Sequence, residues 1–160
     1  IEIEISKNSD PNIDLRVFLK KYNPDLIVLS GYMKIIPDDI VKDYIGKIIN
    51  IHPSLLPKYP GLNTYKKVID NQDKKHGVTI HFVTEELDGG PIILQGEFDI
   101  TEKLNKEKLE LLTHRLEHQI FPKVIMWFAN KIIKLESNKV LFKNKEITSP
   151  IIYATKIENL

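Results

Sequence analysis

Short apolar runs, separated by polar segments, set the pattern along this chain. Ile1–Ile5 and Val78–Phe82 alternate apolar with charged or polar residues, which predicts strands with one buried face. Leu26–Leu29 is apolar throughout, which predicts a strand buried on both faces, as in a parallel sheet. Further runs predict strands over residues 48–51 and 91–100.

Apolar residues three or four positions apart predict helices over residues 13–22, 37–44, 64–71 and 105–130. In the first helix, Ile13, Val17 and Phe18 are expected on the buried face. Pro122 lies inside the last helix, and because the apolar period continues beyond it, we expect a kink rather than an end. Residues 132–135 and 140–142 predict a terminal hairpin.

Strands that alternate with helices predict an α/β fold, in which a mostly parallel twisted sheet is flanked by helices. The length of 160 residues allows one domain, spanning residues 1–160. In such sheets, ligands bind beyond the carboxyl ends of the strands. The loops that begin at Ser30 and His52, and the loop Thr84–Gly90, each follow a predicted strand. We therefore expect them to form one crevice.

Composition narrows the function classes. The net charge of +1 and the absence of a basic stripe argue against nucleic acid as a partner. No apolar run reaches membrane-spanning length, so no membrane association is expected. The chain has no cysteine, which excludes disulfides, thiolate catalysis and cysteine-ligated metals and fits a reducing, cytoplasmic compartment.

The strand over residues 48–51 leads into the segment with the most chemical promise. Asn50 and His52 are two residues apart, so they project from the same side of a strand end. Pro53, Pro57 and Pro60 then stiffen the loop, which suits the positioning of polar groups. A histidine can exchange a proton near neutral pH, and an amide can donate to an oxyanion. The alternative interpretation is ordinary loop capping.

A second candidate is Asp88, which lies beside two glycines in the acidic loop. A carboxylate that contacts His52 would orient the ring and favour its protonated form. The alternative is a polar turn with solvated carboxylates. His114 and His118 have a spacing that can share a metal, but Arg115 stands where the zinc-protease motif has Glu, so no metal site is expected.

Two other stretches have less specific signals. Residues 32–36 place apolar side chains in a loop after a buried strand, where they form either core cover or the wall of a small-molecule pocket. Glu117, beside His118, is either a surface charge or a carboxylate that holds an ammonium group.

Four segments together resemble a known family. These are NIHPSLLPKYPG at Asn50–Gly61, His76-Gly77, LDGGP at Leu87–Pro91, and Leu116–His118. The sequence is similar to the glycinamide ribonucleotide formyltransferases over Tyr22 to about Ile147. The resemblance implies a Rossmann-like fold and transfer of a formyl group from 10-formyltetrahydrofolate to the amine of glycinamide ribonucleotide in purine biosynthesis.

The resemblance also implies roles for individual residues. Asn50 and His52 would stabilise the tetrahedral oxyanion, with His52 as proton donor. Asp88 would orient His52, raise its pKa and help to move protons through water. The folate would contact Met33, Lys34, Ile35, Ile36, Asn50, Thr84, Glu85, Glu86, Leu87 and Asp88. The amine substrate would contact Gly31, Pro53, His114, Arg115, Leu116 and Glu117. We expect no metal, and a monomer or homodimer.

The chain also departs from this family pattern. The family begins with a strand, a glycine-containing loop and a helix that bind the substrate phosphate, and this first strand-helix unit is absent here. We therefore expect an N-terminally truncated fragment. The alternatives are formyltetrahydrofolate hydrolase, a sugar-nucleotide formyltransferase or an inactive folate-binding remnant. Methionyl-tRNA formyltransferase would be expected to carry a further C-terminal RNA-binding domain.

Overall fold

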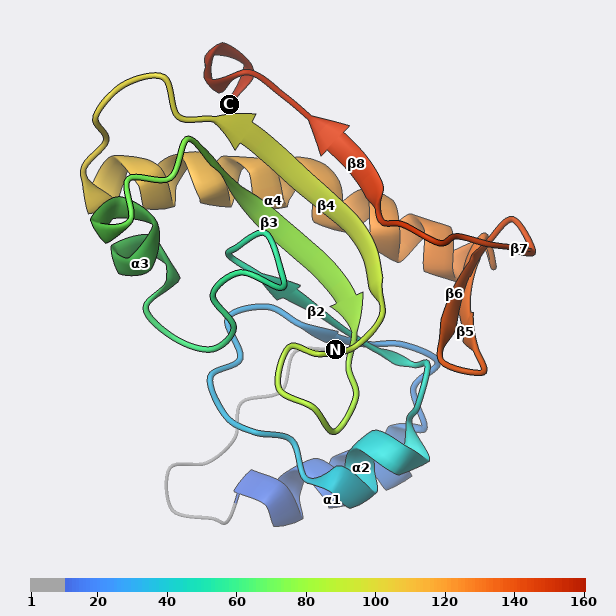
Figure 1. The fold of residues 1–160 in the computed structure, drawn as a ribbon. Helices are drawn as coiled ribbons and strands as arrows, with labels where there is room; N and C mark the ends of the chain where they lie inside the picture. The colour runs from blue at the N-terminus through green and yellow to red at the C-terminus, as the bar shows by residue number, and fades with distance from the viewer. Residues whose placement is uncertain (1–10) are drawn as a thin grey trace.

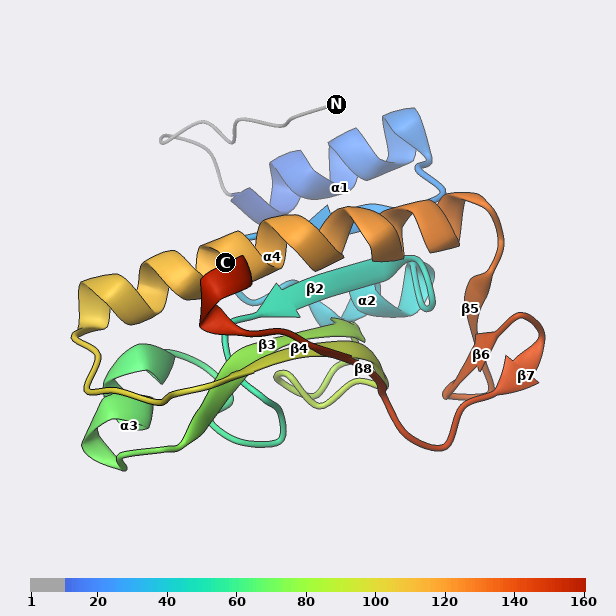
Figure 2. The same cartoon turned by 90° about the horizontal axis from the view of Figure 1, so that it is seen from above.

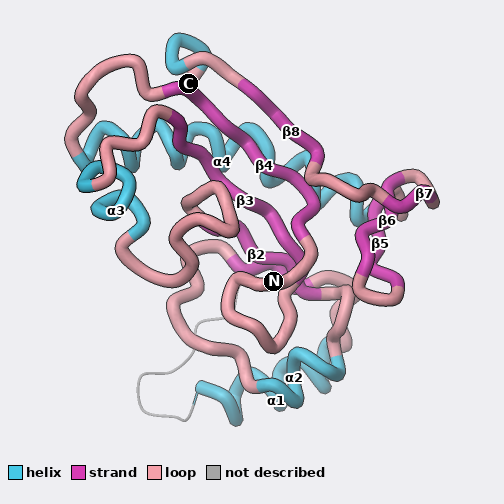
Figure 3. Tube along the Cα trace, in the orientation of Figure 1, coloured by secondary structure: helices cyan, strands magenta, loops and turns pink. Residues whose placement is uncertain are grey.

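The computed structural model describes residues 11–160, which form both helices and strands (Figures 1 and 3). The strand expected at Ile1–Ile5 lies outside these residues. The elements are α1 (Pro11–Tyr22), β1 (Ile27–Leu29), α2 (Asp38–Asp43), β2 (Ile48–His52), α3 (Thr64–Asp70), β3 (Lys75–Phe82), β4 (Ile92–Asp99), α4 (Lys106–Ala129), β5 (Ile133–Glu136), β6 (Lys139–Phe142), β7 (Lys145–Glu146), β8 (Ile151–Ala154) and the 3₁₀ helix η1 (Ile157–Asn159).

The main sheet has five strands in the order β1-β2-β3-β4-β8. β1 and β2 are parallel, as are β4 and β8, whereas β3 is antiparallel to both of its neighbours. Within this sheet β3 alone therefore runs against the common direction. The predicted α/β fold with a mostly parallel sheet is confirmed, with this one reversal.

α4 crosses one face of the sheet and contacts β3 and β4 (Figures 1 and 2). Leu116 and Ile120 pack so closely over β4 that a Cβ atom on Gly96 would lie 2.7 Å from Ile120 Cδ1. The helix continues through Pro122 to Ala129, as the apolar period predicts. The sheet and α4 thus share one large apolar core.

The opposite face of the sheet is polar where the strands β2, β3 and β4 lie side by side. The register pairs Asn50 with His81, His52 with Thr79, and Thr79 with Gln95. Residues paired in this way project to the same side, so these five side chains share a face. The alternate residues of β2, Ile49 and Ile51, belong to the core beneath α4.

Two predictions about buried faces are wrong. Val28 of β1 is 40% exposed, because α4 covers β3 and β4 rather than β1. Among residues 15–22 of α1, whose side chains are described, Leu15 and Leu19 are buried and Val17 is 63% exposed, whereas the side chain of Ile13 lies outside the description. A second, smaller core joins α1 to α2 and β1. Leu15 and Leu19 are buried because they lie on the side of α1 that faces this core.

The C-terminal part is more ordered than the sequence pattern predicts. The expected hairpin is present as β5 and β6, and β7 adds a third strand to it. β8, which was not predicted, lies on the edge of the main sheet beside β4. Tyr153 Oη donates to Gln119 Oε1 at 3.2 Å, which fastens β8 to α4. Along residues 11–160, no helix has the length and apolar character needed to cross a membrane.

Candidate active site

The loop after β2 is fixed by hydrogen bonds that run beneath it. Thr79 Oγ1 donates to the Ser54 carbonyl at 2.7 Å and accepts from the Leu56 amide at 3.0 Å. Gln95 Nε2 donates to the Leu56 carbonyl at 2.7 Å. The Leu56–Pro57 peptide bond is cis. The polar face of the sheet therefore determines the path of the loop, in addition to the stiffness expected from its prolines.

His52 lies at the end of β2 with an acceptor near each ring nitrogen. Its Nε2 is 2.8 Å from the Tyr59 carbonyl, and its Nδ1 is 3.3 Å from Asp88 Oδ2. Because a carbonyl only accepts, Nε2 carries a proton and donates it to Tyr59. The imidazolium form can satisfy both acceptors at once.

Burial sets the net shift in the pKa of His52, although Asp88 raises that pKa as expected. Burial lowers the pKa of His52, and this effect outweighs the hydrogen bond to Tyr59 and the charge of Asp88, which both raise it. The side chain is only 7% exposed, so the loss of hydration of the cation exceeds the gain from its neighbours. Burial therefore disfavours the protonated ring, although the surrounding acceptors are arranged for a cation.

Asp88 is held in place by donors on several sides. Its Oδ2 accepts from the Gly61 amide at 2.8 Å, and its Oδ1 lies 3.6 Å from His81 Nε2. Burial alone would raise the pKa of Asp88, but the nearby His81 ring, the hydrogen bond from the Gly61 amide and the charge of His52 lower it to about 2. The carboxylate is therefore ionised at neutral pH, and the predicted contact with His52 is confirmed.

The route by which Asp88 reaches His52 differs from our expectation. Because β3 is antiparallel to β2, its carboxyl end lies at the opposite end of the sheet from His52. The connection from Val83 to Pro91 folds back over the polar face and brings Asp88 to the proline-rich loop (Figure 1). Gly90 permits this path, since a Cβ atom there would lie 1.8 Å from the Phe82 carbonyl oxygen.

Asn50 is paired with a histidine that the sequence analysis did not select. Asn50 Nδ2 lies 3.2 Å from His81 Nε2, and His81 Nδ1 lies 2.9 Å from the Phe82 carbonyl. The carbonyl requires a proton on Nδ1, so in neutral His81 the Nε2 atom accepts from the Asn50 amide. This contact sets the orientation of the amide. The signal for it was the alternation in Val78–Phe82, which places Thr79 and His81 on the face opposite the core.

The residues expected to contact folate differ in how far they are exposed. Met33, Ile35 and Leu87 are apolar yet 72%, 78% and 63% exposed, so they are available to a ligand. Ile36 is only 8% exposed and belongs to the α1–α2 core, so it supports the loop from below.

Lys34, Glu85 and Glu86 are exposed and Thr84 is half-buried. Glu85 pairs with Lys42 at 2.9 Å, which joins the acidic loop to α2.

The residues expected to contact the amine substrate are also divided. Leu116 is fully buried in the core, so it cannot contact a bound molecule. The Arg115 guanidinium donates to the Leu160 carbonyl at 2.8 Å. His114 and Gly31 are exposed, and Pro53 is half-buried next to His52.

Glu117 is the carboxylate of this group. Burial raises the pKa of Glu117, although His114 and His118 oppose the shift. Burial also raises the pKa of Tyr65, and the charge of Glu117 adds to that effect. Glu117 therefore lies close enough to α3, the helix that follows the proline-rich loop, to act on Tyr65.

Two pockets lie elsewhere in the described part of the chain. One is lined by residues of α3 and of the β4–α4 connection, and the other by Leu55, Lys58, Tyr59 and the start of β3. Neither is lined by Asn50, His52 or Asp88. Among the described residues, no three histidine, aspartate or glutamate side chains gather as a metal site would require.

The arrangement suits the activation of a carbonyl group. An oriented amide, a buried histidine and an ionised carboxylate meet where two fixed loops cover the sheet. An amide N–H can stabilise the negative charge that develops on a carbonyl oxygen under attack. The imidazole and carboxylate can then transfer protons.

Comparison with known proteins agrees with this chemistry. The model of the formyl transferase family matches residues 4–125. The phosphoribosylglycinamide formyltransferase of Escherichia coli is 45% identical over 73% of this chain. The solved structure of phosphoribosylglycinamide formyltransferase from Coxiella burnetii, in complex with CHES, has a TM-score of 0.84 at 40% identity and covers 89% of this chain. A formyltetrahydrofolate deformylase from Pseudomonas syringae pv. tomato has a TM-score of 0.78 at 27% identity and covers 82% of this chain.

The chain is shorter than these proteins. The matched region spans 55% of the Escherichia coli protein, 68% of the Coxiella burnetii chain and 44% of the deformylase chain. The family model nevertheless matches most of the residues printed above, and the motifs at Asn50–Gly61 and Leu87–Pro91 lie within the match. This chain therefore belongs to the formyl transferase family.

Proposed function

We propose that the chain provides the catalytic residues for formyl transfer from 10-formyltetrahydrofolate to the amine of glycinamide ribonucleotide in purine biosynthesis. The observation that carries the proposal is the convergence of Asn50, His52 and Asp88 on one point, with His81 behind them. The similarity to phosphoribosylglycinamide formyltransferases supports this acceptor. The expected partners are the two small molecules, bound by a cytoplasmic monomer or homodimer.

In the proposed reaction the amine lone pair attacks the formyl carbon, and the carbonyl π electrons move to the oxygen. The Asn50 amide donates to this oxyanion, and protonated His52 donates a proton to it. The attacking nitrogen loses a proton through water towards Asp88. When the intermediate collapses, the oxygen returns its proton to His52 and the carbonyl re-forms. The bond to the folate nitrogen breaks, and that nitrogen takes the electron pair together with the proton relayed through water from the side of Asp88.

The exposed apolar side chains support folate as the formyl donor. Met33, Ile35 and Leu87 offer an apolar surface, and Leu87 lies beside Gly61 in the same loop that holds Asp88. A flat aromatic ring system would cover such a surface and remove it from water. The proposed amine contacts are with Glu117, His114, Gly31 and Pro53.

The test is an assay of tetrahydrofolate release from 10-formyltetrahydrofolate. We expect release that depends on glycinamide ribonucleotide, and a fall in kcat of roughly 10²-fold or more in His52→Ala and in Asp88→Asn. Folate binding should persist in both variants. Lys145→Ala, which changes an exposed residue of β7, is the control and should keep full activity.

Other outcomes would favour the alternatives. Release with water as the sole acceptor would point to a formyltetrahydrofolate deformylase, and release with a sugar-nucleotide amine to a sugar-nucleotide formyltransferase. Near-normal turnover in His52→Ala or Asp88→Asn would refute the proposed roles. Folate binding without release from any acceptor would leave a binding remnant.

A further inference from the structure

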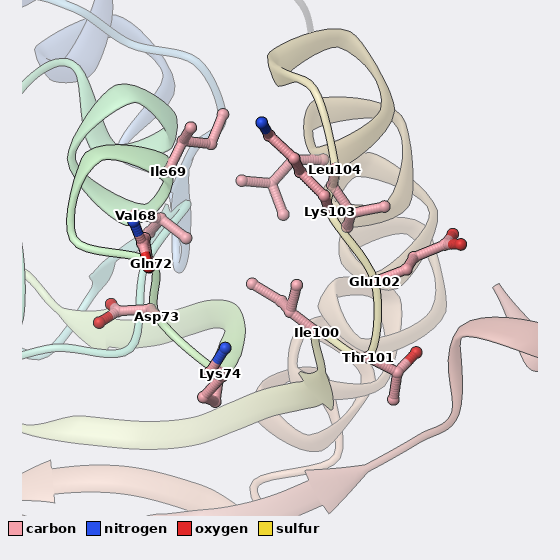
Figure 4. Close-up of a pocket in the computed structure, with 11 residues that line it drawn as sticks. Val68, Ile69, Gln72, Asp73, Lys74, Ile100, Thr101, Glu102, Lys103 and Leu104 are labelled. Atoms are coloured by element: carbon pink, nitrogen blue, oxygen red, sulfur yellow. The ribbon is translucent and has the colours of Figure 1, made fainter.

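A pocket of about 430 Å³ lies between the end of α3 and the segment that connects β4 to α4 (Figure 4). Its floor is apolar: Val68, Leu104 and Leu109 are almost fully buried, and Ile69 and Ile100 are half-buried. No residue proposed for formyl transfer lines it. Its volume is in the range of sites that hold small organic molecules.

Two lysines and two acidic residues line the pocket. Lys74 and Lys103 stand on opposite walls, and within the described residues neither makes an ion pair. Asp73 also lines the pocket, but its carboxylate is turned to the outside, where it accepts from Tyr59 Oη at 2.9 Å and from Lys58 Nζ at 3.2 Å (Figure 4). The Glu102 carboxylate also points away from the opening (Figure 4).

Main-chain hydrogen bonds fix both walls. The Asp73 amide donates to the Val68 carbonyl at 3.1 Å and turns the chain at the end of α3. The Ile100 amide donates to the Lys74 carbonyl at 2.8 Å and joins one wall to the other. A pocket held open in this way requires little ordering when it binds a ligand.

We propose that this pocket binds a small organic anion that has an apolar body and one carboxylate or phosphate group. The apolar body would cover Ile69, Ile100 and Leu104, and the anionic group would lie between Lys74 and Lys103. Burial of the body supplies affinity, and the two ammonium groups supply the preference for negative charge. A polyanion such as a nucleic acid does not fit, because its charges would face the apolar floor.

The test uses probes that differ in charge but share one apolar body. 1-Naphthoate, 1-naphthyl phosphate and the uncharged 1-naphthalenemethanol are each titrated into the ¹⁵N-labelled protein. We expect saturable shifts of amide resonances at residues 68–74 and 100–104, with both anions bound more tightly than the alcohol. The ratio of the two anion affinities identifies the preferred anionic group.

Substitutions separate the charged part of the site from the apolar part. The double variant Lys74→Gln, Lys103→Gln should weaken binding of the anions about tenfold and leave binding of the alcohol unchanged. Ile69→Trp should fill the pocket and abolish binding of all three probes. The matched control, Lys20→Gln with Lys145→Gln, removes two exposed lysines elsewhere and should change nothing.

The proposal is overturned if no probe gives saturable shifts at these amides. It is also overturned if the alcohol binds as tightly as the anions, or if both the double lysine variant and Ile69→Trp bind like the unaltered protein. Each readout is independent of formyl transfer, so failure here leaves the proposed function unaffected.

Discussion

At the scale of single residues, the site depends on a competition between charge and burial. Asp88 lies near both His52 and His81, and the sequence analysis considered only the effect of its charge. In the folded chain, burial has the larger effect on His52 and lowers its pKa. Asp88 itself keeps a pKa of about 2, because donors surround it. Both pKa values are therefore lowered, that of His52 because burial dominates and that of Asp88 because its neighbours outweigh burial.

His81 is therefore expected to control the ionisation of Asp88. His81→Phe keeps a ring of similar size and removes the nearby imidazole that helps to stabilise the carboxylate. Burial would then dominate, and the pKa of Asp88 should rise from about 2 to its usual range or above. The measurement is a ¹³C NMR titration of the Asp88 carboxyl group.

The matched control for this titration is His118→Phe, which alters an exposed histidine on α4. Asp88 should titrate in that variant as it does in the unaltered protein. An unchanged Asp88 titration in His81→Phe would show that the Gly61 amide and His52 are sufficient to hold the carboxylate ionised.

The sequence was informative about those site residues that depend on local geometry. Period-2 spacing placed Asn50 and His52 on one side of β2, and the structure has them there. The burial of Leu116 and Ile36 could not be predicted, because it depends on which helix face and which side of a loop meet the core. His81 was overlooked because its partner Asn50 is distant in sequence, although the alternation of β3 indicated its side.

At the scale of elements, pairing between strands that are distant in sequence sets the direction of β3 and the position of β8, which the sequence pattern could not predict. The apolar runs and helix periods predicted most elements close to their observed bounds. They contained no information on the direction of β3, which is set by its pairing with β2 and β4. β8 is a short run at the sheet edge with two exposed residues, so its pattern is weak without β4 beside it.

Thr79 joins two of these elements, and its hydroxyl is expected to stabilise the proline-rich loop. Thr79→Val keeps the shape of the side chain but leaves the Leu56 amide and the Ser54 carbonyl without their buried partner. Unsatisfied buried groups of this kind cost about 2 kcal/mol of unfolding free energy. Urea denaturation of both proteins would measure the loss.

Thr148→Val is the control for this comparison, because Thr148 is exposed and its substitution should change stability little. If Thr79→Val were as stable as the unaltered protein, the loop would be held by its prolines and Gln95 alone. A loss of stability without a change in the Asp88 titration would show that the loop relaxes without moving Gly61.

At the scale of the whole molecule, one buried histidine links folding to pH. His76 is 1% exposed, packs edge-on against Tyr65 and Phe98, and its Nε2 atom has no hydrogen-bond partner among the described residues. Burial lowers the pKa of His76 to about 4, although the charge of Asp73 opposes this. The unfolded chain, whose histidine has the ordinary pKa of 6.5, therefore binds a proton before the folded chain does.

Stability should consequently fall as the pH falls from about 6.5 towards 4. Between pH 7.5 and 4.5 this single histidine should reduce the unfolding free energy by about 2.5 kcal/mol. His52, whose pKa is also lowered by burial, acts in the same direction. Asp88 stabilises the fold at neutral pH. This effect is lost only at lower pH, as the pH falls from the ordinary pKa of 3.8 towards about 2.

His76→Phe isolates the contribution of this residue, since it keeps an aromatic ring between Tyr65 and Phe98 and cannot titrate. We expect the variant to be at least as stable as the unaltered protein at pH 8, where it removes an unsatisfied nitrogen. At pH 4.5 its advantage should grow by about 2.5 kcal/mol, measured by urea denaturation across the pH range. His114→Phe, at an exposed position, is the control and should run parallel to the unaltered protein. If the unfolding free energies of His76→Phe and of the unaltered protein changed in parallel with pH, the buried ring would gain a proton as readily in the folded state as in the unfolded one. At a position that is 1% exposed, this would require the core around His76 to open.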